Sequence, residues 1–147
     1  MAEIKEELIK MLNSALELEH AARIQYLAHA ELIRGLGAEK IIERLKEIAS
    51  DEEKHEGIFR NLIGDYLAGE PSMGIAPTHR AKETKDILKV NRKNEKEAID
   101  AYRKIYKTIT DNKDKLQYVF EKLEHEVRHV INDEEEHVAE LTVLLGD

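Results

Sequence analysis

The chain has 147 residues and a net charge of −8 at pH 7, and 41% of its residues are hydrophobic, 5% aromatic and 37% charged. A chain of this length buries a single core, so we expect one domain over residues 1–147. The acidic balance, without any cluster of lysine and arginine, excludes the basic surface that nucleic acids require. The absence of cysteine excludes disulfides, thiolate-bound zinc and iron–sulfur clusters, and it fits a cytoplasmic location.

The N-terminal stretch MAEIKEELIKMLNSALELEH interrupts its apolar residues with charge every few positions. It therefore predicts neither a signal peptide nor a membrane span, and we expect a soluble protein without a membrane partner. Apolar residues at helical spacing predict a first amphipathic helix that ends near the glycines of RGLG. They are Ile4, Leu8, Met11, Ala15, Ala22 and Ile33.

Three further helices follow, and no strand pattern competes with them. The second begins near Ala38 and fades at YLAGEPSMGIAP, the third spans about residues 83–110, and the fourth follows the DNKD sequence. The linker over residues 69–82 holds both prolines and is long enough to cross the whole bundle. The sequence therefore predicts an all-α four-helix bundle in which a long crossover makes helices two and three parallel.

Acidic and imidazole side chains interrupt the apolar stripe of every predicted helix. An i, i+3 spacing brings a carboxylate and an imidazole to the same side of one turn, and this pattern occurs in the second and fourth helices. We predict that six residues converge in the core: Glu19, Glu52, His55, Glu95, Glu134 and His137.

Two other Glu-x-x-His pairs fall on polar faces. Glu17 and His20 align with charged and polar neighbours in the first helix, and Glu126 and His129 do so in the fourth. These two pairs are therefore predicted to lie on the surface, which shows that the spacing alone does not identify a site.

Four ionised carboxylates in one core would be very costly unless they were paired or bound to metal. Two divalent cations would balance their four negative charges, because neutral imidazoles add none. Oxygen and imidazole ligands suit iron or manganese. A dinuclear metal site is the favoured interpretation, and a hydrated or protonated polar core without metal is the alternative.

The chain resembles the ferritin-like di-iron carboxylate superfamily, and most closely bacterioferritin and ferritin, with rubrerythrin as a further relative. The resemblance rests on ELEHAARIQYLAHA and DEEKH in the first half and on NEKEAIDAYRKIY and NDEEEH in the second. It implies two iron ions per chain. One ion would be held by Glu19 and His55 and the other by Glu95 and His137, while Glu52 and Glu134 would bridge both.

The resemblance also implies roles for residues around the metal ligands. Asp51 would accept the ring N–H of His137, and Asp133 that of His55, which would orient both imidazoles. Tyr26 and Tyr102 would hydrogen-bond the terminal carboxylates or supply an electron, and core aromatics with a satisfied hydroxyl are the alternative. His29, one turn beyond Tyr26, is predicted to be structural.

Three departures from the family pattern refine these expectations. Glu53 stands where haem-binding bacterioferritins place a methionine, so we expect no haem. Ala98 stands where rubrerythrins carry an additional glutamate, so a movable ligand of that kind is missing. Only ten residues follow His137, too few for the extra C-terminal helix of ferritin cages, which argues against a shell of that kind. A homo-oligomer, a dimer or larger, is still expected.

The predicted function is that of a ferroxidase, which binds two Fe(II) and oxidises them with O₂ or H₂O₂. Two alternatives remain open from the sequence. One is a peroxide reductase of the rubrerythrin type without its electron-transfer module. The other is a non-catalytic bundle in which metal is structural or absent.

Overall fold

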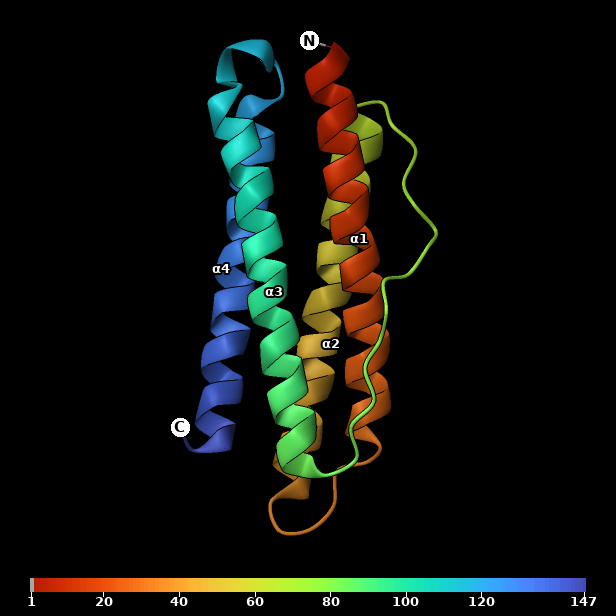
Figure 1. Cartoon of the computed structure of the whole chain (residues 1–147), viewed down its shortest axis with the longest axis vertical. Coiled ribbons are helices and arrows are strands. Elements are labelled where there is room, and N and C mark those ends of the chain that lie inside the picture. Colours follow the sequence, from red (N-terminus) through yellow and green to blue (C-terminus); the bar gives the residue numbers. More distant parts are fainter. Residues whose placement is uncertain (1) are drawn as a thin grey trace.

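The computed structural model describes residues 2–147, which fold into four long helices with α1 at Ala2–Ala30, α2 at Ala38–Asn61, α3 at Thr84–Asp111 and α4 at Phe120–Leu145 (Figure 1). A π-helical turn, η1 (Leu62–Tyr66), extends α2, and a short 3₁₀ turn, η2 (Lys113–Lys115), lies between α3 and α4. No strand occurs within residues 2–147. The prediction of an all-α four-helix bundle is confirmed.

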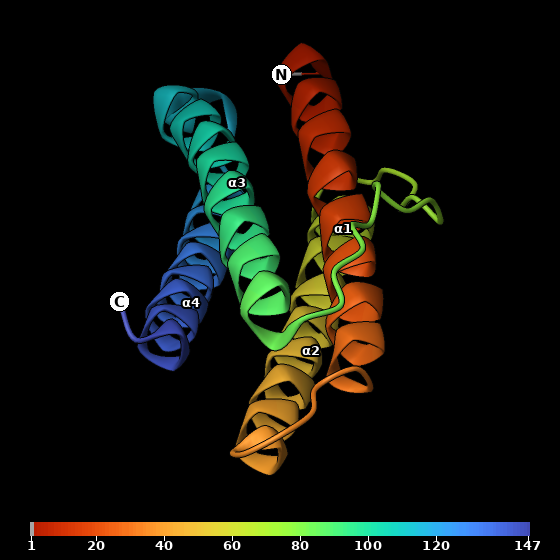
Figure 2. The same ribbon diagram turned by 60° about the horizontal axis from the view of Figure 1, so that its bottom comes forward.

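The connections are short, long and short, as predicted. Helices α1 and α2 form one antiparallel pair and α3 and α4 form the other, while α1 also contacts α3 and α2 contacts α4. The crossover over residues 67–83 returns along the outside of α1, so that α2 and α3 run in the same direction (Figures 1 and 2). None of the helices described over residues 2–147 is long and apolar enough to cross a membrane.

The apolar core consists of two clusters that are separated along the bundle axis. One cluster gathers the first half of α1, the end of α2 and the α3–α4 turn, and includes Leu12, Phe59 and Leu123. The other gathers the opposite end of the bundle and includes Leu45 and Leu141. The level between the two clusters is where the polar residues of the predicted site lie.

The first helix differs from the prediction in two respects. It ends at Ala30 rather than at the RGLG sequence, and Gly35 and Gly37 adopt positive φ angles of 98° and 78° in the turn that follows. Met11 and Ala22 are only half-buried, whereas Leu12 and Leu16 are fully buried. The reason is that α1 packs against both α2 and α3, so its buried arc is wider and rotated relative to the predicted stripe.

The crossover is fastened to the polar face of α1. The side chain of Asn13 accepts a hydrogen bond from the Ser72 amide (2.7 Å), and the Ser72 hydroxyl donates to Glu17 (2.5 Å). His20 Nδ1 donates to the carbonyl of Gly74 (2.7 Å). Glu17 and His20 therefore lie outside the core as predicted, but they hold the crossover rather than facing open solvent.

Candidate metal centre

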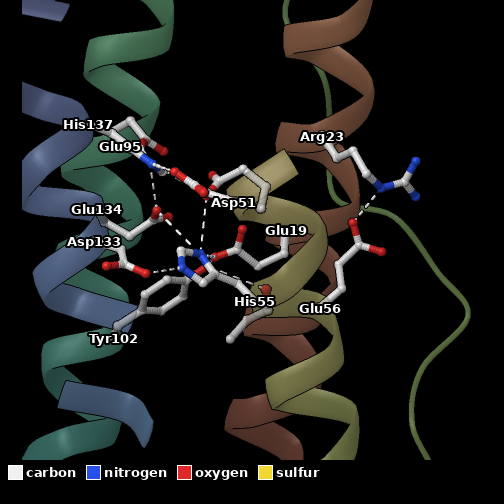
Figure 3. Close-up of polar contacts among 12 residues, drawn as sticks. Glu19, Arg23, Asp51, His55, Glu56, Glu95, Tyr102, Asp133, Glu134 and His137 are labelled. Atoms are coloured by element: carbon white, nitrogen blue, oxygen red, sulfur yellow. Dashed lines mark hydrogen bonds and ion pairs between the residues drawn. The ribbon is translucent and has the colours of Figure 1, made fainter. Parts of the chain in front are cut away.

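The six residues predicted to converge do so in the middle of the bundle. Each of the four helices contributes at least one of them, and all six are buried, with 0–2% of each residue exposed. Figure 3 labels Glu19, His55, Glu95, Glu134 and His137. They form two overlapping groups in which the potential ligand atoms lie within 4.8 Å of one another. The first group is Glu19, Glu52, His55 and Glu134, and the second is Glu52, Glu95, Glu134 and His137.

Glu52 and Glu134 belong to both groups, and each histidine points its Nδ1 atom towards them. His55 Nδ1 lies 3.2 Å from Glu52 Oε1 and 3.5 Å from Glu134 Oε1. His137 Nδ1 lies 3.0 Å from Glu134 Oε1 and 3.6 Å from Glu52 Oε1. The two carboxylates thus occupy the position that ligands shared between two ions require.

The terminal carboxylates Glu19 and Glu95 belong to one group each. Glu19 Oε1 lies 3.4 Å from His55 Nδ1, and Glu95 Oε2 lies 2.7 Å from His137 Nδ1. The terminal carboxylate and the histidine of each group come from different helices, α1 with α2 and α3 with α4. This arrangement follows the antiparallel pairing of the helices.

Each histidine turns its other ring nitrogen outwards, to an aspartate across the bundle. His55 Nε2 donates to Asp133 (2.9 Å), and His137 Nε2 donates to Asp51 (2.9 Å). A proton fixed on Nε2 leaves the Nδ1 lone pair free to face a cation. The effect of the two aspartates on metal binding remains a prediction.

Burial and nearby negative charge raise the pKa of three of the carboxyl groups, Glu19, Glu52 and Glu95. Burial raises the pKa of Glu19 to about 7, and the charge of Glu134 acts in the same direction. Burial also raises the pKa of Glu52 well above its usual range, again together with Glu134. Burial also raises the pKa of Glu95, and the hydrogen bond between Glu95 and His137 opposes this increase.

The imidazoles respond in the opposite sense to burial. Burial lowers the pKa of His55, but the carboxylate of Glu19 beside its Nδ1 and the charge of Glu134 outweigh it and raise the pKa to about 9. For His137, the same balance with Glu134 and Glu95 raises the pKa to about 12. Without metal, protons would therefore take the part of the missing positive charge.

Several buried atoms of the centre lack a hydrogen-bond partner within residues 2–147. Such atoms are rare in folded proteins, and a bound ion or water is one explanation for them. Carboxylate oxygens and an imidazole nitrogen, with no thiolate, form a donor set that suits iron or manganese. The atoms without a partner are Glu19 Oε2, both oxygens of Glu52 and of Glu134, His55 Nδ1 and Tyr26 Oη. The residues present therefore fit two divalent cations.

The two predicted tyrosines are both buried but differ in their contacts. The Tyr102 hydroxyl donates to Glu19 Oε1 (2.9 Å), whereas the Tyr26 hydroxyl has no partner within residues 2–147. Burial raises the pKa of both hydroxyls well above the usual range, so both are neutral donors.

A cavity of about 310 Å³ reaches the centre from the α1–α3 side, beneath the crossover. Its floor carries the four carboxylates, and its rim carries Gln25, Asn91 and Asn94. The sequence pattern alone does not single out these three amides as site residues. Asn91 could have been predicted, because it lies three residues after Leu88 and four before Glu95 on the buried side of α3.

The remaining candidate histidines lie outside the centre. His29 is buried, and both of its ring nitrogens are hydrogen-bonded. Its Nε2 lies 3.0 Å from the His79 carbonyl oxygen, and its Nδ1 lies 2.9 Å from the Asn91 side-chain amide nitrogen. Glu126 is half-exposed and paired with Lys122, and His129 is exposed. These placements agree with the predicted structural role of His29 and the predicted surface position of the 126/129 pair.

Comparison with known proteins identifies relatives over nearly the whole chain. A bacterial ferritin of Neisseria meningitidis serogroup B is 31% identical over 107 residues, which cover 72% of this chain and 68% of the relative. A ferritin-like, diiron-carboxylate protein from Bacillus anthracis superposes with a TM-score of 0.90 at 26% identity, covering 99% of both chains.

The bacterioferritin of Rhodobacter capsulatus, described with a metal-free dinuclear site and a haem iron, shares the fold. Its TM-score is 0.85 at 24% identity, covering 96% of this chain and 84% of that one. Residues 9–147 match the model of the ferritin family, which describes a ferritin-like domain. Together with the four-helix fold, these matches show that the chain belongs to the ferritin-like domain family.

Proposed function

We propose that this protein is a ferroxidase that binds two Fe(II) as substrate in the bundle core and oxidises them with O₂ or H₂O₂. The observation that carries the proposal is the set of partnerless carboxylate oxygens, four of them on Glu52 and Glu134, which lie between the two histidines. A buried set of this kind needs cations, and two divalent ions would neutralise its four negative charges.

The residues divide into three roles in this proposal. Glu19 with His55 would hold one iron, Glu95 with His137 would hold the other, and Glu52 and Glu134 would bridge the two. A pair of metal ions at about 3.5–4 Å can share the charge that develops on an oxidant. The protein supplies position and charge balance, and the iron supplies the electrons.

The residues around the ligands would act on orientation and on proton supply. Asp51 and Asp133 would hold the imidazoles by accepting their Nε2 protons. Tyr102 would orient Glu19 through its hydrogen bond, and Tyr26 would offer a neutral donor towards the α1–α3 cavity that it lines. Supply of an electron by either tyrosine also remains a prediction.

Ala98 favours iron oxidation over peroxide reduction of the rubrerythrin type. It lines the cavity at the level of the carboxylates and carries no ligand atom, so neither iron could exchange one carboxylate for another there. The absence of haem, a cytoplasmic location and a homo-oligomer remain predictions. Ile24 and Leu27 on α1, with Leu32 in the turn after it, form an exposed apolar surface that an oligomer could cover.

Metal analysis of the purified protein, combined with an aerobic Fe(II) oxidation assay, tests the proposal. The expected result is about two irons per chain, as for a two-metal centre, and faster Fe(III) formation than in buffer alone. A protein that bound no iron after anaerobic loading would contradict the proposal and would support a structural bundle instead.

A further inference from the structure

The cavity that contains the metal centre is larger than two ions and the proposed oxidants require. Its volume of about 310 Å³ corresponds to roughly ten water molecules at their share of liquid volume. It opens on the α1–α3 side, and its floor is formed by Glu19, Glu52, Glu95 and Glu134. A molecule with several more atoms than O₂ or H₂O₂ can therefore reach the position of the two ions.

Small apolar side chains form part of the cavity wall on three sides, beside polar residues such as Glu97 and His79. Ala22 lies on the α1 wall, Ala98 on the α3 wall, and Ala76 and Pro77 contribute the crossover wall. A side chain longer than a methyl group at position 98 would project into the space above the carboxylates. The size of residue 98 therefore determines how large a molecule the cavity accepts.

A hydrogen-bond network holds the outer wall in place. Gln25 Nε2 donates to Asn91 Oδ1 (2.9 Å) and to Asn94 Oδ1 (2.8 Å). Gln25 Oε1 accepts the backbone N–H of His79 in the crossover (2.7 Å). One side chain thus joins α1, α3 and the crossover, which makes the cavity a pre-formed pocket, as small-molecule sites usually are.

We propose that this cavity admits small alkyl hydroperoxides, R–OOH, as oxidants of the bound iron. This inference rests on the proposed ferroxidase function and names a further class of oxidant for it. The alkyl group would lie against the alanine walls, and the hydroperoxide group would reach the carboxylate floor, near the partnerless hydroxyl of Tyr26. An uncharged oxidant suits a passage that ends in four carboxylates, because burial of an unpaired anion is costly.

The reaction balances without another reductant. The O–O bond breaks, each of two Fe(II) ions loses one electron and becomes Fe(III), and two protons are taken up from solvent. One oxygen leaves as the alcohol R–OH and the other as water. One alcohol is therefore formed for every two irons oxidised.

Stopped-flow oxidation of the Fe(II)-loaded protein tests the proposal with tert-butyl hydroperoxide and H₂O₂ as probes. The wild-type protein should react with both probes faster than free Fe(II), with tert-butanol measured as the product. Ala98→Leu adds three carbon atoms and should slow the reaction with tert-butyl hydroperoxide by about tenfold or more, since even one methylene group in a pocket gives discrimination of that order. The reaction with H₂O₂ should change far less.

Ala101→Leu is the matched control, because Ala101 lies one turn along α3, is half-buried and does not line the cavity. It should leave both reactions unchanged. If Ala98→Leu fails to fold, Ala22→Leu narrows the same cavity from a half-buried position on α1.

A second measurement avoids iron oxidation altogether. Zn(II)-loaded protein titrated with tert-butanol should show NMR shifts at the amides of Ala22 and Ala98, and Ala98→Leu should remove them. Three results would overturn the proposal: H₂O₂ oxidises the iron but tert-butyl hydroperoxide does not, Ala98→Leu slows both probes equally, or the wild-type amides do not shift. Inertness of the iron towards O₂, H₂O₂ and the hydroperoxide alike would instead contradict the ferroxidase function itself.

Discussion

The two halves of the molecule repeat one ligand pattern but support it with different contacts. In the α1–α2 half, Glu19 receives a hydrogen bond from Tyr102 of the other half and lies 3.4 Å from His55. In the α3–α4 half, Glu95 lies 2.7 Å from His137, and the corresponding tyrosine, Tyr26, has no partner within residues 2–147. The centre is therefore symmetric in its ligand types and asymmetric in the hydrogen bonds that position them.

Asp51 and Asp133, the outer aspartates that accept hydrogen bonds from the two histidines, differ in their exposure to solvent. The Asp133 side chain is 27% exposed and also lies 3.6 Å from His129, whereas the Asp51 side chain is 43% exposed. A less exposed aspartate is less screened by solvent and holds its histidine more firmly. Similar sequence motifs therefore need not give two metal positions with equal hydrogen-bond support.

The largest expected effect comes from removing a carboxylate that both halves share. Glu134→Ala should abolish the binding of both ions and the oxidation of Fe(II), as should Glu52→Ala. The bundle should still fold, because removal of one buried carboxylate also removes like-charge repulsion in the metal-free protein. Metal content, Fe(II) oxidation and circular dichroism measure the three effects.

Glu126→Ala is the control for this variant, since Glu126 lies on the same helix and forms an ion pair with Lys122 (3.2 Å) outside the core. It should retain metal and activity. If Glu134→Ala retained two irons per chain, the assignment of Glu134 as a shared ligand would be wrong.

A smaller effect on metal affinity is expected from replacing the outer aspartates. Asp51→Ala and Asp133→Ala should each keep the fold and weaken metal binding by about 10–100-fold, as loss of such partners typically does. The effect should be larger for Asp133, whose side chain is less exposed. Competition titrations with Co(II) would give both affinities, and unchanged affinity in both variants would reject the role of the Asp–His hydrogen bonds.

The metal-free protein should become less stable as the pH rises. Glu19 has its pKa raised from 4.5 to about 7 and His55 from 6.5 to about 9, so the folded state binds more protons than the unfolded state over this range. Stability is then fully present below the unfolded pKa values and is lost as pH increases through the folded ones. Metal binding should strengthen over the same range, because protons compete with the cations.

Thermal unfolding of the metal-free protein at several pH values between 5 and 9 measures this effect. Glu19→Gln should show a smaller pH dependence than the wild type, because one of the titrating groups is gone. A melting temperature of the metal-free wild type that rose steadily with pH would contradict the assigned direction.

The smallest effect separates the two tyrosines. Tyr102→Phe should lower the free energy of unfolding of the metal-free protein by about 1 kcal/mol, since the hydrogen bond to Glu19 is lost. Tyr26→Phe removes a buried hydroxyl without a partner and should leave that free energy unchanged or slightly higher. Urea unfolding compares the two variants, and equal losses would show that the halves are equally supported.

Much of the fold and of the ligand set was predictable, because both depend on helical periodicity. A charged residue such as Glu52 or Glu134, placed between apolar residues at three- and four-residue spacing, must face the core once the helix packs. For the same reason, the polar neighbours of Glu17 and His20 predict that these two residues lie outside the core. The pairing of Asp51 and Asp133 with the histidines came from the family resemblance, since spacing along one helix says little about contacts across the bundle.

The supports of the site could not be predicted in the same way. The sequence shows that residues 69–82 form a long connection, but it does not show where the connection docks on α1. The contact between Gln25 and His79 depends on that path, and so does the cavity beneath it. The difference between Tyr26 and Tyr102 depends on how the two helix pairs meet, which a repeated motif does not reveal.

The most direct test of the central claim is an anaerobic titration with Fe(II), followed by mixing with O₂ and, separately, with H₂O₂. A di-iron ferroxidase should saturate at two Fe(II) per chain, form a di-ferric product within seconds of mixing with O₂, and show no large preference for H₂O₂. Protein that was inert to O₂ but turned over peroxide rapidly with an added reductant would contradict the ferroxidase assignment and support a peroxide reductase.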